Sequence, residues 1–201
     1  MSVKIGIYIT FFVLMLSNAV KAQDDAITAQ DSVKDARKQI TFYASPVYRI
    51  AQFASTSASF GGVAAGISIN KQIDIGFSYS IILNDFEKKI IFPTSHNYAQ
   101  RNTEMSIHYV FTACKIRPLA GVSLSLTEAI WSNDAESVET YRDFFFNHGG
   151  YGGLDWSINK YLTFLIKLGY TVSQDVELIG FEREDFNGFD ARFELRINIG
   201  K

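Results

Sequence analysis

The sequence predicts an all-β fold, an eight-stranded antiparallel up-and-down β-barrel that crosses a membrane. Three observations predict this fold. Apolar and polar side chains alternate along eight segments of roughly ten residues, which is the period of a strand with two unlike faces. The links between these segments are alternately long and short, as in a closed meander of neighbouring strands. The chain also opens with an export signal, and no later segment is apolar for long enough to cross a membrane as a helix.

The first 22 residues have the features of a secretory signal peptide. Lys4 supplies a positive charge, an apolar run follows from Ile5 to Leu16, and small residues lead up to Ala22. We expect cleavage after Ala22, because a membrane-spanning helix needs about 20 apolar residues. Residues 23–38 are polar and are expected to form a periplasmic tail, so that residues 39–201 make up the barrel domain.

Alternation is clearest in three of the eight segments. Ile73 to Ile81 and Phe189 to Ile199 alternate without a break, and Tyr161 to Ser173 does so with Leu165 as the one apolar side chain on the polar face. Weaker alternation marks the remaining five strands: Ile40 to Ile50, Gly62 to Asn70, Thr103 to Ala113, Leu119 to Thr127 and Gly149 to Ile158.

The lengths of the links predict the two ends of the barrel. Hairpin-length links are expected at 70–72, 114–118 and 159–160, and longer loops at 51–61, 84–102, 128–148 and 174–188. Short turns therefore gather at one end and long loops at the other. Both ends of the barrel domain lie on the short-turn side.

Two kinds of barrel fit the alternation, and they differ in which face of the sheet is turned outward. A soluble ligand carrier of the lipocalin kind would turn its apolar face inward, whereas a membrane barrel turns that face toward lipid. The polar face is rich in Gly, Ala and Ser rather than in the Lys and Glu expected of a water-facing sheet, and the apolar face of the three clearest strands carries no charge. Aromatic residues also gather near both ends of the apolar face. These features favour the membrane barrel.

In these features the chain resembles the small eight-stranded bacterial outer-membrane barrels, such as the OmpA membrane domain and OmpX. The resemblance covers about residues 39–200 and rests on architecture rather than on a catalytic motif. It implies an outer-membrane location with lipid as a partner, and a monomer by default. The polar face would then supply an interior network: Asp74, His108, Asp155, Lys167, Asp190, Arg192, Glu194 and Arg196. Since eight strands leave an interior just filled by side chains, no open pore is expected.

The loops carry the candidate interaction residues. Ten acidic residues lie between Glu128 and Asp185 in the two loops 129–147 and 174–187 or beside them. Four aromatic residues of these loops are candidate protein-binding anchors: Trp131, Tyr141, Phe145 and Phe181. We expect a structural or surface-interaction role through these loops, with protein or surface ligands as partners.

Few residues in the chain point to chemistry. No Cys or His pattern has metal-ligand spacing, so no metal or other cofactor is expected, and with a formal charge of -2 the chain has no basic surface for nucleic acid. Some small outer-membrane barrels modify lipids with a Ser and a His, and Ser95, His96 and His148 are the residues that could do so here. A lipid-modifying enzyme therefore stays open as the alternative, ahead of the soluble carrier.

Overall fold

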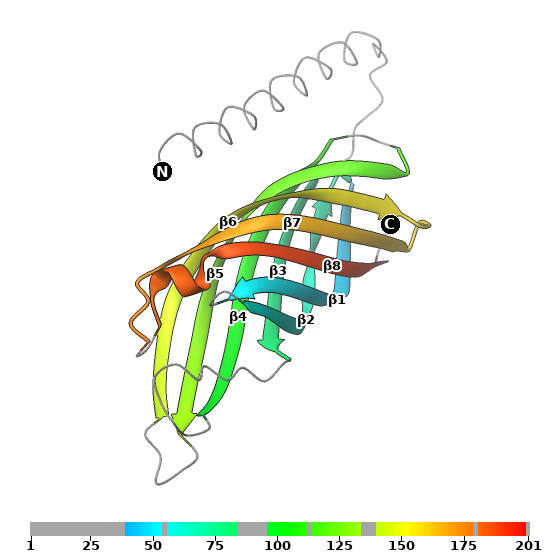
Figure 1. The fold of residues 1–201 in the computed structure, drawn as a ribbon. Coiled ribbons are helices and arrows are strands. Elements are labelled where there is room, and N and C mark those ends of the chain that lie inside the picture. Colours follow the sequence, from blue (N-terminus) through cyan, green and yellow to red (C-terminus); the bar gives the residue numbers. More distant parts are fainter. Residues whose placement is uncertain are drawn as a thin grey trace, which may run out of the picture. The chain divides into compact units, whose positions relative to one another are not determined.

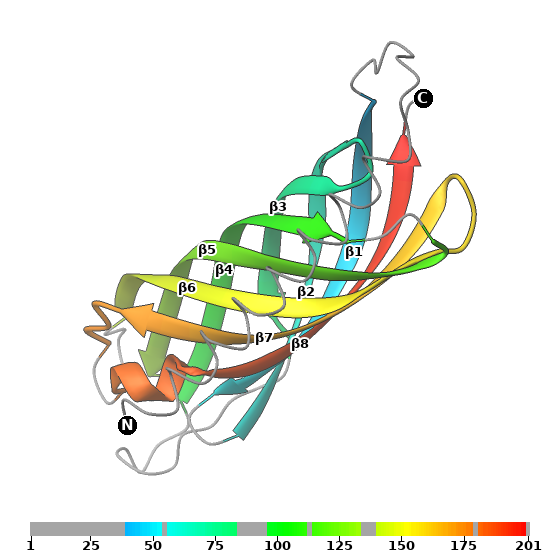
Figure 2. The same ribbon diagram turned by 90° about the horizontal axis from the view of Figure 1, so that it is seen from above.

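Eight antiparallel strands close into a barrel in the computed structural model of the protein (Figures 1 and 2). The structure describes residues 39–53, 56–83, 96–111, 114–133, 140–178 and 181–199. Each strand pairs with the next in the sequence, and β1 pairs with β8 to close the barrel. The expected fold class is thereby confirmed. The expected signal peptide and tail, residues 1–38, lie outside the described residues.

Five of the strands, β1, β2, β4, β5 and β6, are longer than the sequence indicates. Their bounds are β1 Ile40–Phe53, β2 Thr56–Ile69, β3 Ile73–Ile82, β4 His96–Val110, β5 Ile116–Asn133, β6 Thr140–Ser157, β7 Leu162–Gln174 and β8 Gly188–Ile199, and a 3-10 helix, η1, spans Arg183–Phe186. In the described part of the chain, no helix is long and apolar enough to span a membrane.

Two of the four long loops expected from the sequence are largely strand, and a third is shortened. The prediction of a loop at 51–61 is wrong, because β1 continues to Phe53 and β2 begins at Thr56. The loops expected at 84–102 and 128–148 are shortened in the same way by β4, β5 and β6. Beyond the apolar band a strand needs no apolar outward face, so alternation fades there although the hydrogen-bonded ladder continues. The link between β7 and β8 remains a long loop as expected, and residues 84–95 between β3 and β4 lie outside the described residues.

Local sequence fixes the tight turns at the short-turn end. Asn70 and Lys71 both have left-handed backbone, with φ of 54° and 58°, and the Gln72 N–H donates to the Ile69 carbonyl at 3.0 Å. These are the features of the type I′ turn that joins twisted antiparallel strands. In the link from β6 to β7, the Asn159 side chain accepts hydrogen bonds from the next backbone N–H groups of Tyr161 and Leu162.

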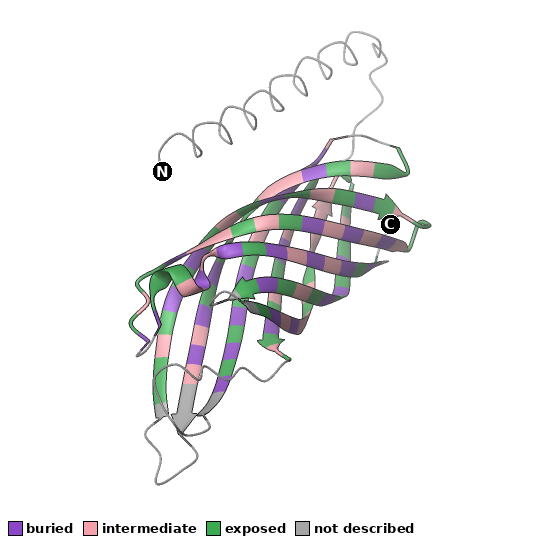
Figure 3. Ribbon diagram, viewed as in Figure 1, coloured by how far each residue is buried: buried purple, intermediate pink, exposed green. Residues whose placement is uncertain are grey.

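Burial alternates along every strand and settles the orientation of the barrel (Figure 3). Large apolar side chains stand exposed on the outward face, whereas charged side chains are buried inside. Such an exterior belongs to a barrel whose surroundings are hydrocarbon rather than water. The alternative of a soluble carrier, which needs the opposite orientation, is therefore wrong. Leu165, the exception noted on the polar face, is fully buried in a small inner cluster with Val110, Leu119 and Tyr151.

Replacing Leu168 with Arg tests this orientation. The Leu168 side chain is 62% exposed in the middle of β7, so in water the change would cost little. In a bilayer it should lower the free energy of unfolding by about 2 to 4 kcal/mol, because the arginine faces hydrocarbon. Urea unfolding in phospholipid vesicles, followed by tryptophan fluorescence, measures the change. Gln174→Arg is the matched control on the same face near the end of β7, where the cost should fall to about 0 to 1 kcal/mol. Equal costs at both positions would contradict the assignment.

Candidate functional site: the barrel interior and its two ends

Strand β8 carries a row of charged side chains into the barrel. Asp190, Arg192, Glu194 and Arg196 occupy alternate positions and therefore all face inward, and all four are buried. Their charges alternate in sign along the strand. Each basic group thus has acidic neighbours two residues away, as in the 3.0 Å contact between Arg192 Nη2 and Asp190 Oδ2.

Two ion pairs run from β8 across the interior of the barrel. Arg192 pairs with Glu104 of β4, and Arg196 pairs with Asp74 of β3. Because β8 has β1 and β7 as its neighbours in the sheet, these partners belong to non-adjacent strands. The two arginines therefore occupy the cross-section that a pore would need.

Further ion pairs complete the neutralisation of the interior. Lys167 Nζ lies 2.5 Å from Glu194 Oε1, Arg49 Nε lies 2.8 Å from Asp190 Oδ2, and Arg117 Nη2 lies 2.8 Å from Asp155 Oδ1. Among the described residues these contacts join five basic to five acidic side chains: Arg49, Arg117, Lys167, Arg192 and Arg196 with Asp74, Glu104, Asp155, Asp190 and Glu194. An unpaired charge in such a place would carry a large desolvation cost, which the pairing offsets.

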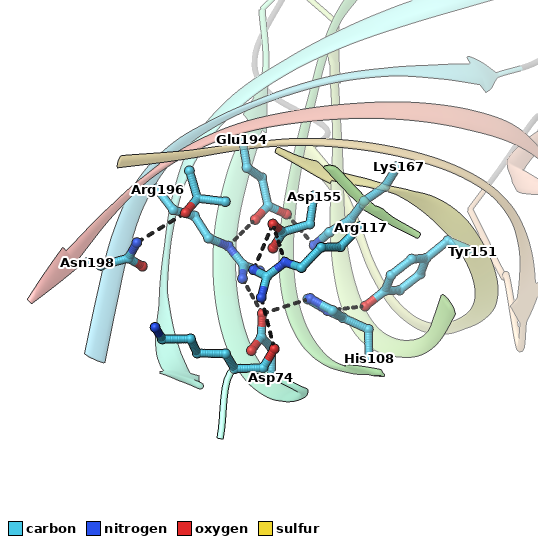
Figure 4. A network of polar contacts seen from close by, with 11 residues as sticks. Asp74, His108, Arg117, Tyr151, Asp155, Lys167, Glu194, Arg196 and Asn198 are labelled. Atoms are coloured by element: carbon cyan, nitrogen blue, oxygen red, sulfur yellow. Dashed lines mark hydrogen bonds and ion pairs between the residues drawn. The ribbon is translucent and has the colours of Figure 1, made fainter. Parts of the chain in front are cut away.

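Two tyrosines, Tyr151 and Tyr43, fill the space around this network, and Figure 4 shows Tyr151 beside His108. The Tyr151 hydroxyl lies 3.1 Å from His108 Nδ1, and the Lys167 ammonium lies 5.2 Å from the centre of the Tyr151 ring. On the other side His108 Nε2 approaches Asp74 Oδ2 at 2.9 Å. The Arg196 guanidinium lies over the Tyr43 ring at 3.9 Å. Rings and charges thus pack together into a continuous layer.

Glycines opposite Tyr43 make room for its ring. A Cβ atom at Gly66 of β2 or Gly76 of β3 would overlap the Tyr43 hydroxyl. The small residues on the polar face therefore let a tyrosine from β1 lie against the wall formed by β2 and β3. This explains why that face combines glycines with charged residues rather than being uniformly polar.

A neutral polar layer follows toward the long-loop end. Its side chains are hydrogen-bonded one to the next from β4 to β7. The bonds are Tyr98 Oη to Gln100 Oε1 at 2.9 Å, Gln100 Nε2 to Asn102 Oδ1 at 3.1 Å, Thr127 Oγ1 to Asn102 Oδ1 at 2.6 Å, Asn147 Nδ2 to Thr127 Oγ1 at 2.6 Å and Ser173 Oγ to Asn147 Oδ1 at 2.5 Å. The carbonyl oxygen of Phe186 lies 3.2 Å from the same Ser173 hydroxyl as a second acceptor for its proton, which ties this layer to η1.

An apolar cap covers the polar layers at the long-loop end. We use this name for one buried cluster: Ala51, Ala58, Phe60, Tyr98, Ala129, Phe145, Leu178, Phe181 and Phe186. Phe145 and Phe186 meet edge to face with ring centres 4.6 Å apart, and Phe181 lies 5.6 Å from Tyr98. Leu178, Phe181 and Phe186 come from the β7–β8 link, which therefore folds inward and closes the barrel.

The short-turn end is hollow by comparison. A cavity of about 280 Å³ lies there, and its walls include Lys71, Asp74, Arg117, Asp155 and Arg196. Its other lining residues are polar apart from the ring of Tyr43. The two ends thus differ in kind, with a polar vestibule at one and an apolar cap at the other.

The structure places all eight expected interior residues in the buried network. Sequence reasoning missed Arg49, Glu104 and Arg117, which complete it. Glu104 shares the even-numbered face of His108 in β4, so parity alone could have found it. Alternation begins only at Leu119 and therefore predicts a turn at Arg117, whereas β5 begins three residues earlier, at Ile116.

The expected loop aromatics have a different setting from the one predicted. Phe145 lies in β6 and is 1% exposed, and Phe181 is 8% exposed, so both belong to the cap rather than to an exposed surface. Trp131 and Tyr141 lie in β5 and β6 rather than in a loop, paired in register. Tyr141 is exposed, and the side chain of Trp131 lies outside the described residues.

The two candidate catalytic histidines lie far apart in the structure. Ser95 lies outside the described residues, and His96 is the first residue of β4, opposite Asn133. His148 is opposite Leu124, so the two histidines are separated by nine positions along β5, about 30 Å at the usual rise per residue. His96 and His148 are therefore too far apart to belong to one catalytic site. Among the described residues, no group of three or more His, Cys, Asp and Glu side chains could hold a metal ion.

Several solved structures share this fold. The Neisserial surface protein A has a TM-score of 0.55 at 16% identity, with 80% of this chain and 96% of that chain covered. The N-terminal β-barrel domain of OprF from Pseudomonas aeruginosa has a TM-score of 0.55 at 13% identity, covering 81% and 100%. The outer membrane protein OprG from Pseudomonas aeruginosa has a TM-score of 0.54 at 9% identity, covering 81% and 96%. The predicted resemblance to small eight-stranded outer-membrane barrels is confirmed at the level of the fold. No protein-family model and no curated protein matches the chain.

Paired substitution of Lys167 and Glu194 tests the interior network. Glu194→Leu removes the partner of Lys167 and one of the partners of Arg196, so it should lower the free energy of unfolding by about 3 to 5 kcal/mol. Adding Lys167→Met restores equal numbers of basic and acidic groups and should recover part of that loss. A double-mutant cycle from urea unfolding in vesicles measures the coupling. Additive losses would show that the two groups do not depend on each other.

Proposed function

We propose that this protein is a closed, non-conducting barrel of the outer membrane that displays its long-loop end at the cell surface. The observation that carries the proposal is the contrast between an apolar exterior and an interior filled by a neutral charge network beneath an apolar cap. Such an interior offers no path for ions or solutes. The role of the protein then lies in its outer surface, as a structural component of the envelope or as a partner for surface ligands.

The hairpin of β5 and β6 supports the surface role. Both strands have 18 residues, whereas about 9 to 11 suffice to cross a bilayer at a tilt. Figure 1 shows the two strands running well past the ends of β7 and β8. Exposed Tyr141 lies near the tip, in register with Trp131. We propose that this projecting hairpin is the part of the protein that meets protein or surface ligands.

Two of the loop acids, Asp143 and Asp185, stabilise this surface by accepting hydrogen bonds from the backbone. Asp143 Oδ2 accepts a hydrogen bond from the Glu177 backbone N–H at 2.8 Å, and Asp185 Oδ2 accepts one from the Glu182 backbone N–H at 3.0 Å. The second of these bonds is half of a capping box at η1. These contacts hold the β7–β8 link in place above the cap, so the acids define the shape of the surface as well as its charge.

The native cysteine and an added one test the topology. Cys114 is exposed in the link between β4 and β5, at the short-turn end, and Tyr141 is exposed near the opposite end. In intact cells a membrane-impermeant maleimide should label Tyr141→Cys, made in a Cys114→Ser background, and leave Cys114 of the unmodified chain unlabelled. Permeabilising the outer membrane should make Cys114 reactive. The reverse pattern would contradict the proposed orientation.

Planar bilayers test the closed interior. The purified protein should give no steady single-channel current, because ion pairs fill its cross-section. A variant that combines Phe181→Ser and Phe186→Ser loosens the cap while leaving these pairs intact, and it should stay silent as well. A steady current from the unmodified protein would contradict the proposal.

A further inference from the structure

The outward face of the barrel carries one compact group of charges. Across the strand residues that the structure describes, the outward charged side chains are Arg101 of β4, Glu128 of β5 and Arg142 of β6. They lie on three adjacent strands, and each arginine contacts Glu128. Arg101 Nη1 is 3.4 Å from Glu128 Oε2, and Arg142 Nε is 3.3 Å from Glu128 Oε1. We call these three residues the exterior triad.

The exterior triad lies where the apolar exterior ends. From Ile116 to Leu126 every outward residue of β5 is uncharged, and this run has the length with which a tilted strand crosses hydrocarbon. Glu128 is the next outward residue toward the long-loop end. Phe144 is paired with Glu128 in register and Phe146 lies two residues further toward the membrane, and both are exposed. Aromatic residues below and arginines above are the arrangement expected at the level of lipid headgroups.

The arginines of the triad keep donors for another ligand. Each guanidinium has five N–H donors, and in the described part of the chain each meets Glu128 through a single, long contact. The Arg101 and Arg142 side chains are 51% and 55% exposed, whereas Glu128 is only 17% exposed. The group has a net charge of +1, and its accessible part is basic. A guanidinium fork fits phosphate oxygens in a bidentate manner.

We propose that the exterior triad binds the phosphate headgroup of a lipid in the outer leaflet. Glu128 lies between the two arginines and contacts both, and the acyl chains pack along Leu126, Phe144 and Phe146. A soluble anion would gain nothing from these apolar neighbours, which is why the lipid is the assigned source of the phosphate. This inference rests on the proposed outer-membrane location and long-loop orientation.

Native mass spectrometry of the protein in nonionic detergent tests the inference. The probes are lipid A that carries both of its phosphates and the same lipid after removal of the phosphates. The unmodified protein should retain the phosphorylated lipid preferentially. Arg101→Gln and Arg142→Gln should each weaken retention about fivefold, and together they should remove most of the preference. Inorganic pyrophosphate in excess should not displace the lipid.

Two further variants separate binding from folding. Glu128→Gln removes the carboxylate that competes with the ligand, so retention of the phosphorylated lipid should increase, which a folding defect cannot produce. Arg183→Gln is the matched control, since Arg183 is 57% exposed and paired with Glu184 in η1, away from the exterior triad. It should bind lipid like the unmodified protein. Faster gel migration without boiling shows that each variant forms a closed barrel.

The outcomes separate the inference from the proposed function. Folded arginine variants that keep the preference of the unmodified protein for the phosphorylated lipid overturn the triad as a headgroup site and leave the proposed function intact. Displacement by pyrophosphate overturns the assignment to lipid in favour of a soluble anion. If the unmodified protein does not fractionate with outer membranes or shows no heat-dependent mobility, the proposed function fails instead.

Discussion

The pairing of the β8 charges across the barrel is the constraint on which the rest of the structure depends. Once Asp190, Arg192, Glu194 and Arg196 face inward, each must find an opposite charge in a space that water can barely enter. Partners reach them from β1, β3, β4 and β7, so strands far apart in sequence are joined through their side chains as well as through the barrel wall. The small residues on the opposite walls follow from the same constraint, because Tyr43 and the long basic side chains need the space.

The two ends of the barrel differ because they are closed by different means. Toward the long loops, the charged layer gives way to amides and hydroxyls and then to aromatic rings, so polarity falls stepwise from the middle to the cap. Toward the short turns, the charged layer borders directly on a polar cavity. Loop residues close one end because the β7–β8 link is long enough to fold inward. The tight turns at the other end are too short to place side chains inside the barrel.

The exterior follows the opposite rule from the interior. Inside, charges are numerous and neutralised, whereas on the outward face of the described strand residues they are confined to the exterior triad at the edge of the apolar band. In hydrocarbon each additional charge is costly, but at headgroup level an exposed guanidinium is favourable. The position of a charge relative to the band therefore decides whether it destabilises the barrel or offers a contact to lipid.

The sequence by itself determined the strands, the closed meander and the face that each residue occupies within the apolar band. It did so because a period of two follows from backbone geometry and because lipid demands an apolar outward face. Parity was also sufficient to identify interior residues such as Asp74 and Glu194, and it could have added Glu104. Only the tertiary structure decided which charges pair, since Arg196 and Asp74 are brought together by the curvature of the closed sheet rather than by spacing. It also decided that β5 and β6 extend beyond the band and that Phe145 and Phe181 are buried, because outside the bilayer the alternating pattern has no single solvent to enforce it.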